Sequence, residues 1–442
     1  MDETKNSADL TALSEPPVWI DGKQLNEVLF CEEFLQTHPM KSVNGTFCTV
    51  EGRVSDENGL KKEIYDLLKP YFTTGLTKRV SNLLDTMRME SYAPDLPIHR
   101  NRIHVANGTL FLDGRFDPGK EYCRNRLPVG YNPDAPQPVV WLRFLSELLE
   151  PEDVPTLQEF MGYCLIPSTK GQKMLMLVGR GGEGKSRIGL VLRSMLGCNM
   201  ATGHLAKIEC NRFARADLEH ELVMVDDDLK LEALPETNII KAIITAELPM
   251  DLEKKGQQSY QGDLYVRFFG FGNGSLKALY DRSEGFFRRQ IILAVKRKDP
   301  DRADDPFIAE KMCAETEGVF LWCLDGLYRL MANNYQFTIS ARAKENMEAA
   351  VSDGNNIVDF MASVGYIRLK ADYEVSSKDL YAVYKRWCDD NALNALAAKS
   401  LSSFLIEHAD DYNLERSNRI HGGGGKLVRG FLGIELLQRV LS

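Results

Sequence analysis

The sequence predicts an α/β protein whose parallel sheet ends in a phosphate-binding loop. Three observations support this fold class. The segment 179–186, GRGGEGKS, follows the apolar run 173–178 and precedes a segment, 188–196, with helical apolar spacing. A second apolar run, 221–225, is followed by three aspartates, and a third, 264–271, is followed by Gly-Asn-Gly. Apolar strands that alternate with helices are typical of a sheet covered by helices on both faces.

The glycine-rich segment predicts the ligand, a nucleoside triphosphate. Glycines let backbone N–H groups turn toward phosphate oxygens, and the N-terminus of the following helix adds a positive dipole. In this pattern the lysine reaches the β- and γ-phosphates and the hydroxyl holds Mg²⁺. The alternative, a glycine-rich turn with an incidental lysine, does not account for the flanking strand and helix. The nucleotide-binding residues are therefore Gly179, Gly181, Gly182, Glu183, Gly184, Lys185, Ser186 and Arg187.

Polar side chains follow the next two apolar strands. Asp226 is expected to share the metal with Ser186, and Asp227 is placed to polarise the attacking water as general base. Asn273 is expected to orient that water or to sense the γ-phosphate. The structural alternatives are an acidic turn after a buried strand and an ordinary Asn-Gly turn.

Two adjacent arginines, Arg288 and Arg289, precede one more apolar strand. In a ring-shaped ATPase such a residue reaches the γ-phosphate bound by a neighbouring subunit, and the pattern does not say which of the two does so. The alternative is a solvated basic pair.

Composition excludes several classes of protein. A chain of 442 residues is too long for one core, and about two to four domains are expected. No segment approaches the length of uncharged apolar sequence that spans a membrane. The nine cysteines are scattered without a C-x-x-C pair, which predicts reduced residues of a cytoplasmic protein. The net charge of −9 argues against a protein coated in nucleic acid but permits a local DNA-binding patch.

Taken together, these motifs resemble those of the superfamily 3 helicases, in the phage/plasmid and poxvirus primase–helicase branch. The matching stretches are GRGGEGKS, LVMVDDD, FGFGNG and FFRRQI. Their spacing is compact: 41 residues separate Lys185 from Asp226, 47 separate Asp226 from Asn273, and 15 separate Asn273 from Arg288. The lead-in from 105–112 to 162–165 is similar to that family's pre-ATPase segment.

The resemblance implies an AAA+-like P-loop ATPase core that uses ATP and Mg²⁺ and assembles into a ring, as a hexamer, on DNA. The chain departs from the family pattern in two ways. Its acidic pair is Asp-Asp, whereas the commoner form contains a Glu. The identity of the general base is therefore left open between Asp227, Asp226 and Asp228. The segment before the ATPase is too short for a primase catalytic domain, so a separate primase or polymerase partner is possible.

Resemblance and patterning together predict an α/β chain with an α+β N-terminal domain, a helical collar and a C-terminal winged helix. The predicted units are a flexible lead-in at 1–17, the N-terminal domain at 18–135, the collar at 136–170, the AAA+ ATPase at 171–340, a helical linker at 341–372 and the winged helix at 373–442.

Two segments are predicted to hold DNA. In superfamily 3 the interval between the acidic strand and the asparagine strand carries a hairpin that points into the ring pore. Here it contains Lys254, Lys255 and Tyr260, which suit phosphate pairing and base stacking. The C-terminal unit contributes a basic patch for DNA, or alternatively a protein-docking surface. Its residues are Arg416, Arg419, Lys426 and Arg429.

The predicted function is an ATP-dependent replicative helicase of a phage or mobile element, acting on single-stranded and forked DNA in the host cytoplasm. Two alternatives remain. An origin-binding initiator or helicase loader would use the same motifs without processive unwinding. A small-molecule P-loop kinase would have no use for the paired arginines or for a DNA-type C-terminal unit.

Overall fold

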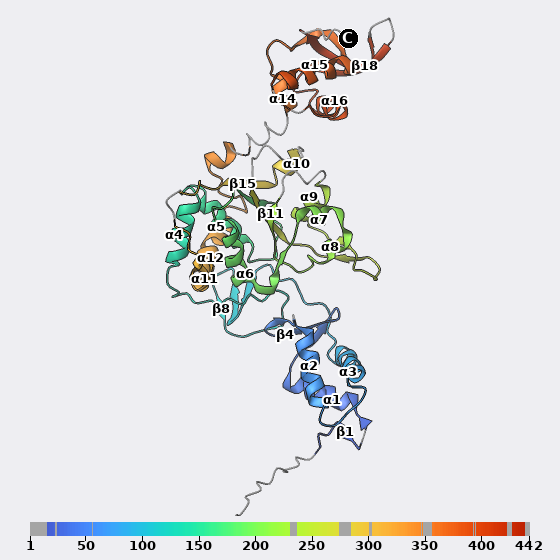
Figure 1. Ribbon diagram of the computed structural model, residues 1–442, viewed down its shortest axis with the longest axis vertical. Helices are drawn as coiled ribbons and strands as arrows, with labels where there is room; N and C mark the ends of the chain where they lie inside the picture. The colour runs from blue at the N-terminus through green and yellow to red at the C-terminus, as the bar shows by residue number, and fades with distance from the viewer. Residues whose placement is uncertain are drawn as a thin grey trace, which may run out of the picture.

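The computed structural model describes residues 16–22, 24–54, 56–229, 237–273, 284–299, 303–345, 347, 356–391, 393, 395–421 and 427–437. Along the long axis of Figure 1, an N-terminal unit (blue) is followed by a central sheet region (cyan to gold) and a C-terminal unit (orange-red). Within the described residues, no helix is both long and apolar enough to cross a membrane.

The N-terminal unit mixes helices and short strands around its own core, in agreement with the predicted α+β class. Phe30, Ile64 and Leu83 are buried in this core. Its elements are β1 (Ile20–Asp21), β2 (Gln24–Leu25), α1 (Glu27–Thr37), β3 (Lys41–Val43), β4 (Thr46–Thr49), β5 (Gly52–Arg53), α2 (Glu57–Leu68) and α3 (Leu76–Glu90). An antiparallel sheet of β6 (Arg102–Val105), β7 (Gly108–Phe111) and β8 (Phe116–Asp117) follows.

The central sheet has five parallel strands in the order β10-β11-β14-β9-β15. These strands are β9 (Met174–Gly179), β10 (Met200–Thr202), β11 (Val223–Leu229), β14 (Arg267–Asn273) and β15 (Gln290–Ala294). The strand before the glycine-rich loop, β9, is therefore flanked by β14 and β15. Because all five strands run in the same direction, their C-terminal ends gather at one edge of the sheet, as the sequence predicted.

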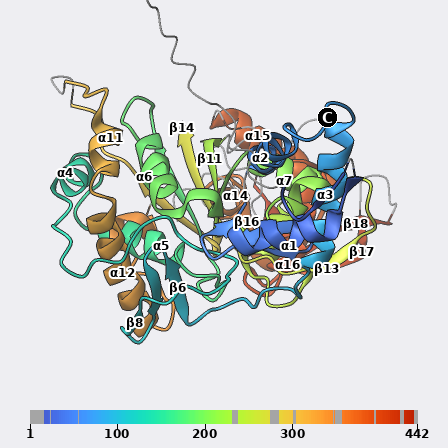
Figure 2. The same ribbon diagram turned by 90° about the horizontal axis from the view of Figure 1, so that it is seen from below.

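Side chains of β9 alternate between two hydrophobic clusters, one on each face of the sheet. Leu175 and Leu177 belong to the first cluster, and Met174 and Met176 to the second, as the two-residue period of a strand requires. Helices on the first face are α4 (Val139–Leu148), α5 (Val154–Tyr163), α6 (Ser186–Leu196), α11 (Ile308–Cys313) and α12 (Thr316–Ala332). Those on the second are α7 (Leu205–Cys210), α8 (Arg212–Ala216) and α9 (Asn238–Ile244). Figure 2 shows α5, α6 and α12 across the sheet from α7.

Three further elements complete the central region. A short hairpin is formed by β12 (Met250–Leu252) and β13 (Tyr260–Gly262), a 3₁₀ turn η1 (Gly197–Asn199) follows α6, and α10 (Glu284–Phe287) precedes β15. The helices predicted as a collar, α4 and α5, pack into the same hydrophobic cluster as the sheet. Their boundary as a separate domain remains a prediction.

The C-terminal unit begins earlier than the sequence predicted. Its elements are α14 (Asn356–Met361), β16 (Ile367–Ser376), α15 (Ser377–Asp390), α16 (Ala398–Glu407), β17 (Glu415–His421) and β18 (Leu427–Leu436). Phe360 on α14 and Ile367 on β16 are buried in the same cluster as Tyr384 on α15. The range 341–372, predicted as a helical linker, therefore contains α14 and the start of β16, which both belong to this unit. The antiparallel sheet of the unit has the strand order β16-β18-β17.

Candidate functional site

The glycine-rich loop joins β9 to α6 and opens into a cavity of about 950 Å³. Gly181, Gly182 and Gly184 have φ angles of +105°, +84° and +102°, which side chains with a Cβ rarely adopt. Lys185 and Ser186 line the cavity with Arg187, Gly182, Glu183 and Gly184. Gly179 is the last residue of β9, and Gly181 lies beside Asn273. The loop residues that the sequence singled out therefore form one wall of a single site.

Polar residues from the two neighbouring strands reach the same cavity. Asn273 is the last residue of β14 and lies in register with Gly179. It is exposed and lines the cavity, as does Asp227 from β11. The structure thus brings Asp227 and Asn273 to the loop, because β11 and β14 are successive neighbours of β9 in the sheet.

Asp226 points to the other face of the sheet. It is absent from the described residues that line the cavity, and its carboxylate accepts a hydrogen bond from the N–H of Leu205 at 2.8 Å. His204 lies 3.3 Å from the same carboxylate, which is only 3% exposed. In agreement with the alternation of strand residues between faces, Asp227 lines the cavity and Asp226 does not. The structure therefore does not bring Asp226 to Ser186, as the sequence predicted, and places Asp227 in the same cavity as Ser186.

Magnesium is implied by the loop, and the donor set of the cavity suits it. The Ser186 hydroxyl and the Asp227 carboxylate both line the cavity. Mg²⁺ binds through oxygen atoms, usually one or two carboxylates together with phosphates and water. Ser186 and Asp227 are thus the residues that would hold the ion.

The cavity also contains residues that no motif predicted. Arg143, Phe144 and Glu147 come from α4, and Lys311 comes from α11. They add two cations, a carboxylate and an aromatic ring to the lining of the cavity, and the ring of Phe144 lies against Gly184 of the loop. Only the packing of α4 and α11 onto the same face as α6 brings these residues to the site, so single-sequence motifs could not identify them.

Arg288 and Arg289 lie at the opposite edge of the sheet from this cavity. They precede β15, whose first residue, Gln290, is in register with Met174 at the start of β9. The loop follows the other end of β9, about 16 Å farther along the strand. Arg288 is exposed, whereas Arg289 is half-buried and donates to the carbonyl of Gly285. Neither arginine reaches the cavity of its own subunit.

The predicted DNA hairpin forms, and its basic residues differ in their surroundings. Lys255 is exposed at the tip between β12 and β13. Lys254 instead donates to Glu219 at 3.1 Å and lies over the ring of Tyr260, whose hydroxyl donates to the same carboxylate at 2.6 Å. Tyr260 and Lys254 are therefore held by Glu219, and only Lys255 extends freely from the hairpin.

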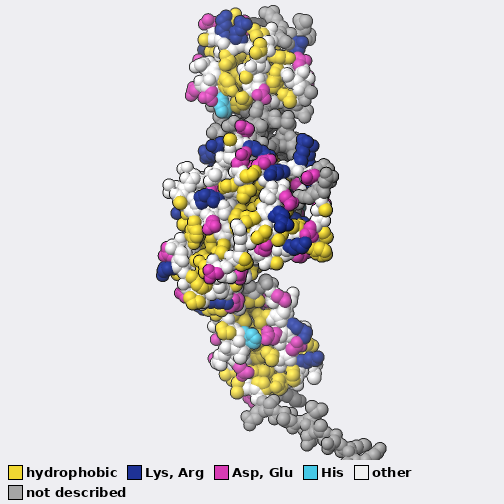
Figure 3. All heavy atoms as spheres, turned by 90° about the vertical axis from the view of Figure 1, so that its left-hand side faces the viewer, with side chains coloured by type: hydrophobic (Ala, Val, Ile, Leu, Met, Phe, Trp, Pro, Cys, Tyr) yellow, Lys and Arg dark blue, Asp and Glu magenta, His cyan; other side chains and the backbone are white. Residues whose placement is uncertain are grey.

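The predicted C-terminal basic patch lies on the hairpin of β17 and β18. Arg416, Arg419 and Arg429 are all exposed there, and Lys426 lies outside the described residues. On the face shown in Figure 3, lysine and arginine side chains are interspersed with acidic and apolar ones over all three units.

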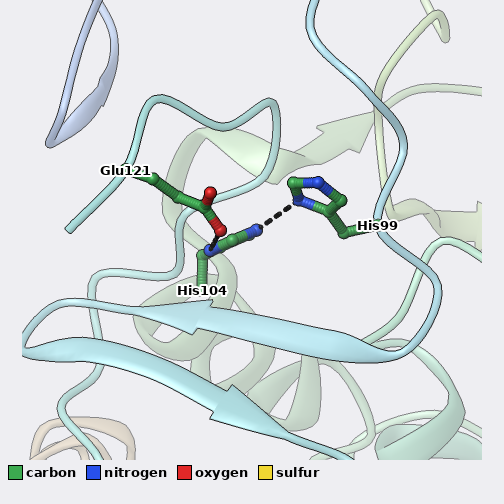
Figure 4. Close-up of side chains that lie close together, drawn as sticks. All are labelled: His99, His104 and Glu121. Atoms are coloured by element: carbon green, nitrogen blue, oxygen red, sulfur yellow. Dashed lines mark hydrogen bonds and ion pairs between the residues drawn. The ribbon is translucent and has the colours of Figure 1, made fainter. Parts of the chain in front are cut away.

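A histidine pair lies apart from the cavity, next to β6 (Figure 4). The Nδ1 atom of His99 is 2.9 Å from Nε2 of His104, whose Nδ1 lies 3.1 Å from the Thr109 hydroxyl. Glu121 approaches His104 from its Nδ1 side, at 3.9 Å, and is paired with Arg102. One possible ligand atom from each of these three residues lies within 4.8 Å of the others, although His99 contacts the Nε2 side of the His104 ring and Glu121 its Nδ1 side.

This pair predicts that the protein loses stability in acid. Burial, with help from His99, Arg126 and Arg102, lowers the pKa of His104 to about 3. In the unfolded chain a histidine titrates near 6.5, so below about pH 6.5 the unfolded state binds the extra proton and the free energy of unfolding falls. We expect the melting temperature to decrease from pH 7.5 to pH 5, and His104→Asn to reduce that decrease.

Burial and the nearby Arg124 also lower the pKa of His220, to about 4. The His104→Asn variant should therefore keep part of the acid sensitivity. An unchanged pH dependence in His104→Asn would show that the buried pair is not responsible.

Two segments of the chain match families of known proteins. Residues 26–150 match the family described as D5 N terminal like, and residues 177–289 match a family of unknown function, DUF5906. A similar solved structure is the apo structure of the NrS-1 C terminal region (305–718), with 10% identity, a TM-score of 0.50, and coverage of 93% of this chain and 100% of that one. The A form apo structure of the same region has 10% identity, a TM-score of 0.48, and coverage of 88% and 87%.

At this identity the likeness shows the fold alone, and no curated protein sequence matches the chain. The D5 match covers the N-terminal units and ends within the predicted collar. The DUF5906 match runs from the strand before the loop to Arg289 and so spans the motifs of the cavity.

Proposed function

We propose that this chain is an ATP-dependent DNA helicase of the superfamily 3 type, which unwinds DNA as a hexameric ring in the replication of a phage or mobile element. The match of residues 26–150 to the D5 N terminal like family supports this proposal. The observation that supports this most strongly is the single cavity that gathers Lys185, Ser186, Asp227 and Asn273. A hairpin with an exposed lysine lies between the acidic and the asparagine strands. Ring assembly fits the position of Arg288 at the opposite edge of the sheet.

In this mechanism the side chains divide the tasks, and Asp227 has two of them, because it would both hold the ion and act on the attacking water. Lys185 neutralises charge on the β- and γ-phosphates of ATP. Asp227 orients and polarises the attacking water, and Asn273 holds that water or the γ-phosphate from the adjacent strand. Magnesium, when bound, neutralises phosphate charge. An arginine of the neighbouring subunit completes the site, so hydrolysis depends on assembly.

The C-terminal unit supports contact with duplex DNA. Its order of α14, β16, α15, α16, β17 and β18 is that of a winged helix, with the hairpin of β17 and β18 as the wing. Arg416, Arg419 and Arg429 are exposed on that hairpin. We assign them to phosphate contacts at the fork or origin.

The test is ATP hydrolysis with and without single-stranded DNA, combined with displacement of a strand from a forked duplex. We expect DNA to stimulate hydrolysis and ATP to drive displacement, with Lys185→Ala inactive in both. A P-loop kinase would show no stimulation by DNA. An initiator or loader would show stimulation without displacement.

A second prediction concerns the hairpin of β12 and β13. Lys255→Ala should weaken affinity for single-stranded DNA, because each phosphate that a lysine neutralises releases counterions. The slope of log affinity against log salt should become shallower by about 0.7 for each phosphate that is no longer neutralised. Lys254→Ala should have a smaller effect, since Glu219 already engages that lysine. ATP hydrolysis without DNA should persist in both variants, and filter binding at several salt concentrations measures the slopes.

Arg416→Ala with Arg419→Ala is the matched comparison. This pair should impair engagement of duplex more than movement on a preloaded single strand. If Lys255→Ala unwinds DNA like wild type while the arginine pair abolishes all DNA binding, the pore hairpin assignment is wrong and the initiator function replaces it.

A further inference from the structure

The side chain of Glu183 turns back into its own phosphate loop. Its carboxylate accepts hydrogen bonds from the N–H of Arg180 at 2.6 Å and from the N–H of Gly181 at 3.0 Å to each oxygen. It also forms an ion pair with Lys185, whose Nζ is 2.7 Å from Oε2. Both side chains of this pair are only 5% exposed.

These contacts give Lys185 an anionic partner before any nucleotide arrives. The lysine of such a loop serves the β- and γ-phosphates of the ligand, and here a carboxylate from the same loop neutralises it. Two N–H groups of the loop donate to the same carboxylate. A buried ion pair is costly to break, because the charge that is left behind loses both its partner and its hydration.

We propose that Glu183 is a positioning residue, the internal counter-ion of Lys185, and that a nucleoside di- or triphosphate binds by taking Lys185 away from it. This inference rests on the proposed nucleotide-binding function of the cavity. In the empty protein, Glu183 holds the lysine and the first turn of the loop in place. On binding, the phosphates compete with Glu183 for the lysine and are repelled by its carboxylate. The Glu183 carboxylate therefore makes the affinity for nucleotide lower than it would be in a loop without this charge.

The sign of the Glu183→Gln effect tests this role. Glutamine keeps the length of the side chain and one amide oxygen as acceptor, and it removes the charge. Hydrogen bonds to charged groups are the stronger ones, so Lys185 should transfer to the phosphates more readily. We expect the Kd for ADP, measured by titration calorimetry without Mg²⁺, to fall by about tenfold. In ATP hydrolysis, KM should fall with no rise in kcat.

The control is Glu310→Gln. Glu310 is exposed on α11 and is not among the described residues that line the cavity, so this variant removes one negative charge near the site without touching the pair. Its Kd for ADP should stay within about twofold of wild type, since exposed charges interact weakly through water. An equal gain in ADP affinity in both variants would show that the loss of any negative charge in this region has the same effect, and it would overturn the proposal.

If Glu183 only stabilised the conformation of the loop, the change in ADP affinity would have the opposite sign, because removal of its carboxylate would loosen the loop and weaken binding. Unchanged or weaker ADP binding in Glu183→Gln therefore overturns the counter-ion role. Melting curves give an independent readout. The empty variant should melt below the wild type, and saturating ADP should raise its melting temperature by more than it raises that of the wild type. Wild-type protein that binds neither ADP nor ATP would overturn the proposed function, and this inference with it, whereas a wrong sign in Glu183→Gln alone would overturn only the inference.

Discussion

Asp227→Asn is expected to bind ATP with near-normal affinity and to hydrolyse it about 10³-fold more slowly. Asp227 is the acid of β11 among the described residues that line the cavity, so we expect its carboxylate to accept a proton from the attacking water. Asparagine preserves the size and polarity of the side chain and removes that capacity. Equilibrium binding of labelled ATP, paired with a single-turnover hydrolysis assay, separates the two effects.

Asp226→Ala should give a different phenotype. Asp226 accepts from the first N–H of α7 and is buried on the other face of the sheet. Removing it leaves that N–H without its partner and should lower the free energy of unfolding by about 2 kcal/mol, with hydrolysis per folded molecule largely kept. If Asp227→Asn hydrolyses ATP normally while Asp226→Asn does not, the cavity does not identify the catalytic acid, and Asp226 is the metal-binding acid that the sequence predicted.

The sequence predicted the parts of this site that depend on local pattern. Apolar runs that end in a phosphate loop, an acidic turn and an Asn-Gly pair were sufficient to place β9, β11 and β14 in one parallel sheet. Most of these stretches lie within the match to the family of unknown function at residues 177–289, whereas the match to the D5 N terminal like family lies before them, at residues 26–150. The family models and the solved structures do not test the individual roles of these residues, which remain predictions.

The sequence could not predict which face of a strand a side chain occupies, or which distant helices reach the site. Adjacent aspartates look equivalent in the sequence, yet the register of β11 sends Asp226 to α7 and Asp227 to the cavity. Arg143 and Lys311 come from separate helices that meet only through packing. The Glu183–Lys185 pair depends on a side-chain conformation inside a loop of left-handed glycines. The C-terminal unit was predicted to begin too late because β16 has seven exposed residues in ten and shows little apolar pattern.

Arg288→Ala should retain ATP binding and lose hydrolysis by about 10³-fold or more, and the defect should be relieved by a partner subunit. Arg288 lies beyond the start of β9, at the far edge of the sheet from the loop, so we expect it to act on the γ-phosphate bound by a neighbouring subunit. Arg289→Ala should have the smaller effect, because that side chain is half-buried and donates to Gly285. Steady-state hydrolysis and nucleotide binding of the two single variants decide between them.

Complementation makes the trans role testable. In a mixture of Arg288→Ala with Lys185→Ala, some interfaces pair an intact loop from the first variant with an intact arginine from the second, so hydrolysis should rise above that of either variant alone. The double variant, Lys185→Ala with Arg288→Ala, is the control. Mixed with the Arg288→Ala variant it should give no rise, since no subunit in that mixture has an intact Arg288. Absence of rescue at every ratio, with subunit exchange verified by fluorescence transfer, would rule out a site shared between subunits. Because Arg288 cannot reach the loop of its own chain, it would also leave the arginine without a catalytic role.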